Sequence, residues 1–169
     1  MSEEKHDEGY SGLQAAKIVG ISYRQLDYWA RTDLIRPSLA DAHGSGSQRR
    51  YSYEDLMRLK LVKRLIDNGL SLQGVRHTVE SIARIEGMTL TNSGIIFLGE
   101  NTSVLARDGD NLVDLLRGNQ MIFGMVLSLN EIKEELESGI VSLEEFRARA
   151  SKIEEQIEPT KTGASAKAH

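Results

Sequence analysis

The sequence of 169 residues contains no cysteine, only two prolines and a single tryptophan. The absence of cysteine excludes disulfides, thiolate metal sites and iron–sulfur clusters. The four histidines are scattered, and no set of Ser, His and Asp side chains suggests a catalytic site. We therefore expect neither a metal site nor an enzyme, and predict a protein that works without a cofactor.

No stretch is both long and apolar enough to cross a membrane, and the acidic segment 1–9 does not resemble a signal peptide. These absences predict a cytoplasmic protein that does not enter the membrane. The chain has a net charge of −4, but residues 10–86 sum to +4 while residues 87–169 sum to −5. A basic first half joined to an acidic second half suits a protein that holds nucleic acid with its first half.

Three serines mark helix starts in the first half. Ser11, Ser22 and Ser52 each stand three positions before a Gln or Asp, which is the pattern of a capping box. Gly20 is expected to end the first helix with φ > 0, and the second helix begins only two residues later. Two helices joined by so short a turn are typical of a helix-turn-helix. The second helix is expected to bury the residues at helical spacing, Leu26, Trp29 and Ala30.

A hairpin with arginine at its base follows the second helix. The run 34–37 should be extended, because a residue before proline avoids the helical region, and 48–51 is the expected return strand. The connection 40–47 is rich in Gly and Ser and is expected to be flexible. Arg49 and Arg50 beside such a loop suit a DNA backbone, since guanidinium groups match phosphate oxygens. The alternative is that both are merely solvated.

This order of helices and hairpin is that of a winged helix-turn-helix, and its residues resemble those of a known family. The first half is similar to the DNA-binding domain of MerR-type transcription regulators in Tyr10-Ser11, Ala16-Lys17, Val19 to Ser22, Leu26, Tyr28-Trp29, Leu34-Ile35, Pro37, Arg50 to Ser52, Asp55-Leu56, Leu59 and Gly69 to Leu72. The resemblance implies that the second helix enters the major groove and that the wing follows the flanking backbone. It also implies a homodimer on a palindromic promoter site, with RNA polymerase as a further candidate partner.

Candidate DNA contacts follow from this resemblance. Base contacts are expected near the start of the second helix, which penetrates the groove, from Tyr23, Arg24, Gln25 and Asp27. Phosphate contacts are expected from Lys17, Tyr28, Arg31, Arg36, Arg49 and Arg50. Asp27 stands where the family usually has a basic residue. Either one phosphate contact is missing there, or the carboxylate accepts from a cytosine amino group.

The second half is predicted to mix helices and strands. A fourth helix, opened by Ser71, should pack on the third through Leu72, Val75, Val79 and Ile82. Gly87 and the segment 89–94 then break the helical pattern, so the long pairing helix common in the family is not evident there. Segments 95–98 and 104–106 are expected to form a hairpin, and 121–129 a central strand.

The last elements are predicted as two separate helices. The first should run over 130–137 and stop at Gly139, and the second should start at Ser142 and end at Pro159. The second helix carries apolar residues at 3-4-3-4 spacing, and we predict a dimer interface from Leu143, Phe146, Ala150, Ile153 and Ile157. The alternative is that this seam docks on the protein's own sheet.

We predict an α+β protein with an N-terminal, mainly helical winged helix-turn-helix and a small C-terminal α+β domain. The expected divisions are a disordered N-terminus over 1–9, the DNA-binding domain over 10–86, a dimerisation or effector domain over 88–157, and a disordered tail over 158–169. For three groups the structural explanation is favoured over a ligand site: core for Met121, Phe123 and Met125, helix capping for Asp108, Asp110 and Asp114, and a wing tip for Gly44 to Gly46.

The sequence thus predicts a regulator that binds double-stranded DNA as a homodimer. The competing hypothesis is a protein-interaction adaptor that uses the same fold, with its basic face on an acidic partner. Asp27 on the second helix, which would read the DNA bases and is called the reading helix below, favours the adaptor hypothesis. The arginines of the hairpin, or wing, favour DNA binding.

Overall fold

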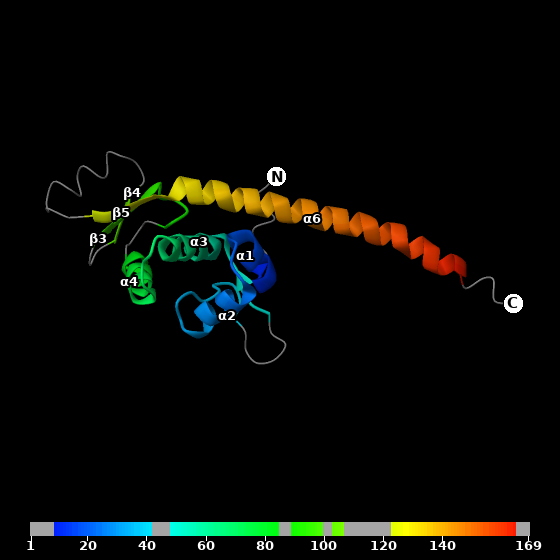
Figure 1. Ribbon diagram of the computed structural model, residues 1–169, viewed down its shortest axis with the longest axis horizontal. Coiled ribbons are helices and arrows are strands. Elements are labelled where there is room, and N and C mark those ends of the chain that lie inside the picture. The colour runs from blue at the N-terminus through cyan, green and yellow to red at the C-terminus, as the bar shows by residue number, and fades with distance from the viewer. Residues whose placement is uncertain (1–8, 42–47, 85–88, 100–102, 107–122, 165–169) are drawn as a thin grey trace.

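A computed structural model describes residues 9–41, 48–84, 89–99, 103–106 and 123–164. Its first half contains β1 (Tyr10–Ser11), α1 (Gly12–Val19), α2 (Tyr23–Arg31), β2 (Arg50–Tyr51), α3 (Tyr53–Asp67) and α4 (Leu72–Ala83). Its second half contains β3 (Ile95–Gly99), β4 (Ser103–Ala106), β5 (Phe123–Ser128) and α6 (Leu129–Ala164). Figure 1 shows a compact group of short helices beneath one long helix, with a small sheet at one end. The chain has the α+β character expected of it.

The three predicted capping boxes are confirmed. The side chains of Ser11, Ser22 and Ser52 each accept a hydrogen bond from the backbone N–H three residues on. In return, the side chain of that later residue accepts from the backbone N–H of the serine. Gly20 ends α1 with φ of 81°, in the left-handed region that glycine adopts without steric cost. The turn between α1 and α2 is therefore fixed by local chemistry at both of its ends.

The base of the wing differs from the predicted hairpin. β2 pairs antiparallel with β1, and an isolated bridge joins Ala40 to Arg50. The outgoing arm of the hairpin is therefore at Ala40, and the expected strand over 34–37 is wrong. Leu34 and Ile35 are instead buried in the core, because apolar side chains gain more from burial there than from an exposed wing. The loop tip, including Gly44 to Gly46, lies outside the described residues.

Helix α4 packs on α3 largely as predicted. Val75 is fully buried, and Val79 and Ile82 are partly buried against the same core. Leu72 is the exception, since it lies in the first turn and is exposed rather than packed. The break after α4 is confirmed by a turn over 90–92, where Glu54 accepts hydrogen bonds from the backbone N–H groups of Leu90 and Thr91.

The second-half sheet has the strand order β4-β3-β5, and both pairings are antiparallel. The hairpin of β3 and β4 is confirmed. β5 covers most of the predicted strand over 121–129, but it lies at an edge, so the prediction of a central strand is wrong. β3 is central because it pairs on both sides, and its Ile96 and Leu98 are buried. Met125 is partly buried against the core, while Met121, the Phe123 side chain and the three aspartates over 108–114 lie outside the description.

Helix α6 is one continuous helix where two were predicted. It passes through Gly139 and the expected start at Ser142, and it continues past Pro159 to Ala164. The helix stop at 139 is wrong for a tertiary reason. A Cβ added at Gly139 would lie 2.9 Å from the carbonyl oxygen of Ile18, so glycine here permits close packing of α6 on α1. The predicted tail beginning at 158 is likewise helical to Ala164, because proline removes one helical hydrogen bond without excluding a helix.

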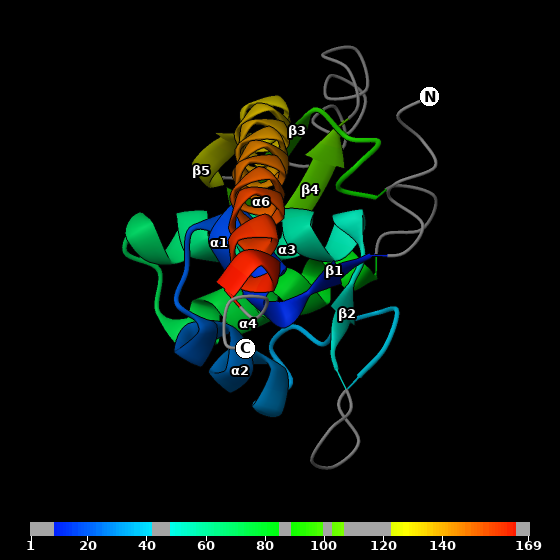
Figure 2. The same ribbon diagram turned by 90° about the vertical axis from the view of Figure 1, so that its right-hand side faces the viewer.

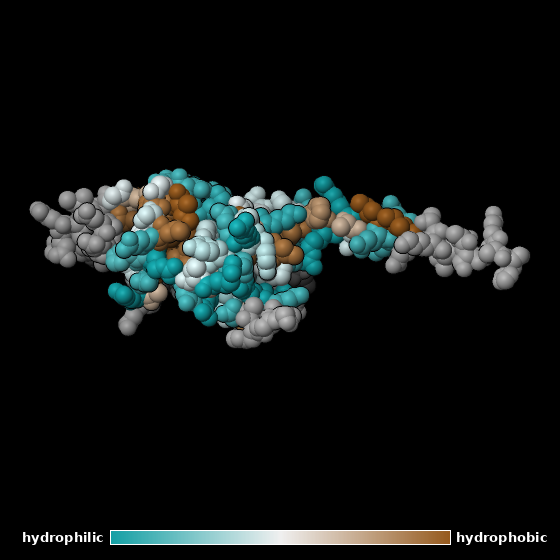
Figure 3. Space-filling view, turned by 60° about the horizontal axis from the view of Figure 1, so that its bottom comes forward, coloured by the Kyte–Doolittle hydropathy of each residue, from teal (hydrophilic) through white to brown (hydrophobic). Residues whose placement is uncertain are grey.

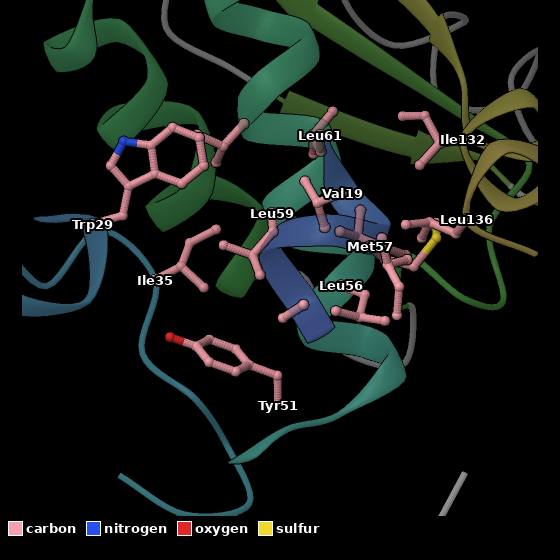
Figure 4. Close-up of a cluster of buried hydrophobic side chains, with 14 of the residues drawn as sticks. Val19, Trp29, Ile35, Tyr51, Leu56, Met57, Leu59, Leu61, Ile132 and Leu136 are labelled. Carbon is pink, nitrogen blue, oxygen red and sulfur yellow. The ribbon is translucent and has the colours of Figure 1, made fainter. Parts of the chain in front are cut away.

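One hydrophobic core joins the two halves of the chain. Buried Ile132 and Leu136 of α6 belong to the same cluster as Val19 and Met57 of the first half, as the labelled side chains in Figure 4 show. The predicted boundary between 10–86 and 88–157 falls in a segment outside the described residues. The two-domain division stays a prediction, and the shared core shows that α6 is integral to the packing of the first half.

Candidate nucleic-acid interface

Helix α2 presents a polar face to solvent. Its apolar side, Leu26, Trp29 and Ala30, is buried as predicted. Tyr23, Arg24, Gln25 and Tyr28 are exposed on the opposite side. In Figure 1, α2 lies on the far side of α1 and α3 from α6, so this face is unobstructed by the long helix.

Two residues at the start of α2 also have structural roles. The Oε1 atom of Gln25 accepts from the backbone N–H of Ser22 at 3.1 Å, which leaves its amide group to donate to a base. The ring of Tyr23 lies against Gly12, where an added Cβ would come within 2.9 Å of a ring carbon. Both side chains are thus pre-oriented at the surface, which lowers the conformational entropy lost on binding.

Asp27 is held by two arginines. Arg49 Nη1 lies 2.7 Å from Asp27 Oδ1, and Arg31 Nε lies 2.9 Å from Asp27 Oδ2. The hydrogen bond from Arg49 is the main cause of a lowered pKa for Asp27, assisted by the charge of Arg31. Both carboxylate oxygens are therefore engaged within the protein, so a cytosine amino group would have to share an oxygen that an arginine already binds.

The other predicted phosphate ligands occupy different settings. Arg36 pairs with Asp33 and, at 3.2 Å, with Asp41, yet more than half of its side chain is exposed. Within the described part of the chain, no ion pair engages Arg24 or Arg50. These two guanidinium groups are the ones most available to an incoming anion.

Lys17 faces away from this surface. Its ammonium lies 4.0 Å from the centroid of the Phe146 ring, a cation–π contact between α1 and α6. Because α6 and α2 lie on opposite sides of α1, Lys17 is poorly placed for a phosphate next to α2. The sequence offered no sign of this contact, since 129 positions separate the two residues.

Figure 2 shows the wing strand β2 beside β1, at the same end of the molecule as α2. A helix-turn-helix and an adjacent arginine-bearing wing thus form one surface. Residues 10–82 match the family described as MerR HTH family regulatory protein. The chain carries a MerR-family helix-turn-helix domain.

Relatives of the chain carry similar descriptions. Proteins from Mycobacterium bovis and Mycobacterium tuberculosis, each described as an uncharacterized HTH-type transcriptional regulator, are 46% identical to it over 121 residues. The alignment covers 71% of this chain and 53% of each relative, so the chain spans about half the length of the curated relatives it matches. The similarity also extends beyond the MerR domain, since 121 residues exceed the span 10–82.

Outside the MerR domain, the predicted dimer seam is solvent-exposed. Phe146, Ile153 and Ile157 are 59%, 56% and 51% exposed, and Ala150 is partly exposed, whereas Leu143 packs partly against the core. Figure 3 shows a strip of hydrophobic atoms on the part of α6 that stands clear of the domain. The alternative that this seam docks on the protein's own sheet is not what the structure shows, because the sheet lies at the other end of α6.

No group of three or more His, Cys, Asp or Glu side chains in the described ranges could hold a metal ion. Among the helices of the described residues, none is long and apolar enough to cross a membrane. The chemistry available around the MerR domain is that of hydrogen-bond donors and guanidinium groups.

Proposed function

We propose that this protein is a sequence-specific DNA-binding transcriptional regulator that acts as a homodimer on a palindromic promoter site. The observation that carries the proposal is the exposed polar face of α2 beside an arginine-bearing wing within a MerR domain. The description of its relatives as transcriptional regulators supports the same conclusion. RNA polymerase is a further partner in the proposal, since a regulator at a promoter works beside it.

The proposed base contacts come from Tyr23, Arg24 and Gln25. Arg24 is the central one, because an exposed guanidinium without an ion pair in the described chain suits the paired acceptors of guanine. The proposed phosphate contacts are Tyr28 and Arg31 in the later part of α2, and Arg36 and Arg50 outside it. Arg50 is the most available of these, because Arg31 and Arg36 each form an ion pair with an aspartate that a phosphate would have to replace.

The proposed dimer forms through the exposed seam of α6. A palindromic site needs two reading heads held about one helical turn apart, so two MerR domains must be joined. The apolar strip on α6 is the surface that a second copy of the same helix would cover. The large exposed apolar side chains of Phe146, Ile153 and Ile157 lie seven and four positions apart, and this spacing supports pairing with another helix.

The adaptor hypothesis loses its main support. It rested on Asp27 as an acidic residue at the reading face. With both carboxylate oxygens of Asp27 paired to arginines, the face of α2 presents no unbalanced negative charge there.

Arg24→Ala and Arg50→Ala test the proposal. A duplex selected from a random library with the wild-type protein serves as the binding site. Arg24→Ala should cost about 1–3 kcal/mol on that duplex and relax the preference at particular base pairs. Arg50→Ala should weaken all sequences alike and reduce the slope of log affinity against log salt by about one. Wild-type affinity and salt slope in both variants would contradict the proposed contacts, and failure to select any duplex would contradict the function.

A further inference from the structure

Arg49 lies where the wing meets the reading helix. Its side chain is only 14% exposed. Besides the 2.7 Å contact to Asp27 on α2, its Nε lies 3.7 Å from Oδ1 of Asp41, near the outgoing arm of the wing. One guanidinium group thus faces acidic groups from two separate parts of the DNA-binding surface.

The neighbouring arginine has the opposite orientation. Successive side chains of a strand point to opposite faces, so Arg49 shares its face with Tyr51 and not with Arg50. Tyr51 is fully buried, and burial raises the pKa of its hydroxyl to about 12 although the charge of Arg49 lowers it. By the same alternation the Arg50 side chain projects from the opposite face, where it is partly exposed, and its backbone N–H donates to the carbonyl oxygen of Ala40 at 2.7 Å. The two arginines therefore have different surroundings.

We infer that Arg49 is a positioning residue, which fixes the wing relative to the reading helix through Asp27 and makes no phosphate contact. The inference rests on the proposed DNA-binding function. A duplex presents its major groove and flanking phosphates at a fixed separation, so a helix and wing held at that separation bind without first being ordered. Asp27 is then the anchor of this link and not a reader of bases.

The pairing also explains how an aspartate is tolerated on a surface that meets DNA. An unpaired carboxylate on α2 would repel the phosphates. Arg49 and Arg31 neutralise the charge of Asp27 through ion pairs within the protein. Removing the charge of Asp27 therefore has two opposed effects, a loss of positioning and a loss of repulsion, and the inference requires the loss of positioning to be the larger.

A double-mutant cycle tests the inference with Asp27→Asn, Arg49→Gln and the two combined, on the duplex selected by the wild-type protein. If Arg49 positions the wing, Asp27→Asn weakens binding about tenfold, although electrostatics alone would strengthen it. Arg49→Gln should weaken binding by a similar factor without lowering the salt slope. The double variant should bind no worse than the weaker single variant, because both changes break the same link.

Arg50→Gln is the matched control, since it removes the adjacent guanidinium from the outer face. It should lower the salt slope by about one and combine additively with Asp27→Asn. Circular dichroism melts show whether each variant remains folded, and Arg49→Lys, which keeps the charge without the planar fork, should restore only part of the affinity. Tighter binding by Asp27→Asn, or a slope lowered by one in Arg49→Gln, overturns the inference. Wild-type binding to the duplex stands apart as the test of the function itself.

Discussion

Both halves of α6 carry apolar residues at helical spacing, but the two halves have different surroundings. Ile132, Leu136 and Ile140 are buried against α1 and α3, while Phe146 and Ile153 further along are exposed. The helix continues straight past the edge of the domain (Figure 1). The same chain covers Ile132, Leu136 and Ile140 in the first half of α6, whereas Phe146 and Ile153 in the second half have no such cover in the described structure.

Polar contacts follow the same division. Glu135 in the docked half pairs with Lys60 at 3.1 Å and with Arg64, and Tyr53 forms a hydrogen bond to Glu137. In the second half the contact of Lys17 with Phe146 is the cation–π pair that reaches back to the domain. The docked half is thus fixed by packing and charge together, and it sets the direction in which the second half projects.

The largest effect is expected from charges in the exposed half. Phe146→Asp combined with Ile153→Asp places carboxylates in the proposed seam, and burying unpaired charge there is costly enough to prevent pairing. Sedimentation should show folded monomers, with much weaker binding to a palindromic duplex. A double variant that remains dimeric and binds normally would exclude this seam as the interface.

A truncation in the docked half should reduce stability directly. Leu136→Ala leaves a cavity in the shared core and should lower the free energy of unfolding by about 2–5 kcal/mol. Ile153→Ala, in the exposed half, is the matched control. In urea unfolding at low protein concentration, Ile153→Ala should have the same free energy of unfolding as the wild-type protein. If the seam pairs in a dimer, this variant should become less stable than the wild-type protein as the protein concentration rises.

A smaller effect is expected from Gly139→Ala. The new Cβ meets the carbonyl oxygen of Ile18, and this clash should exceed the gain in helix propensity, for a net loss of about 1–2 kcal/mol. Gly74→Ala in α4 is the control, because its added Cβ would make only an ordinary contact at 3.4 Å with Ser71. The control should keep or raise the thermal midpoint. Equal behaviour of the two variants would mean that α6 does not need the close approach.

The smallest effect concerns the charge of Glu135. Partial burial alone raises its pKa, but the hydrogen bond and charge of Lys60, with the charge of Arg64, outweigh this and lower it. A lowered folded pKa gives stability that is present above the ordinary value of 4.5 and is lost as pH falls through the folded pKa. Glu135→Gln should therefore cost less than about 1 kcal/mol at pH 7 and nothing in acid. Unfolding curves at both pH values, with Glu134→Gln as control, check this.

Local signals made most of the first half predictable. Ser11, Ser22 and Ser52 form their capping boxes with residues three positions away, so a short stretch of sequence contains the whole interaction. The hairpin of β3 and β4 was predictable for the same reason. The strand at Tyr10–Ser11 was missed because two residues carry no period, and its partner β2 lies 40 positions away.

Features that depend on distant contacts were not predictable. Glycine commonly ends a helix, and only the close approach of Gly139 to Ile18 explains why α6 continues through this position. Among the predicted DNA contacts, those on the exposed face of α2 could be predicted, because helical spacing shows which side chains point away from the core. The pairing of Asp27 with Arg49 could not, because it requires the wing to fold back on α2 across 22 positions.

The packing of Gly139 on Ile18 also has a consequence for how the protein is made. A ribosome delivers α1 and α3 first, and about 70 residues separate the end of α3 at Asp67 from Gly139. At about 5–20 residues per second, the interval lasts on the order of 4–14 seconds. During that time Val19 and Met57, which α6 covers in the finished chain, are exposed to chaperones and to neighbouring nascent chains. We therefore expect the reading head to complete its core only late in translation.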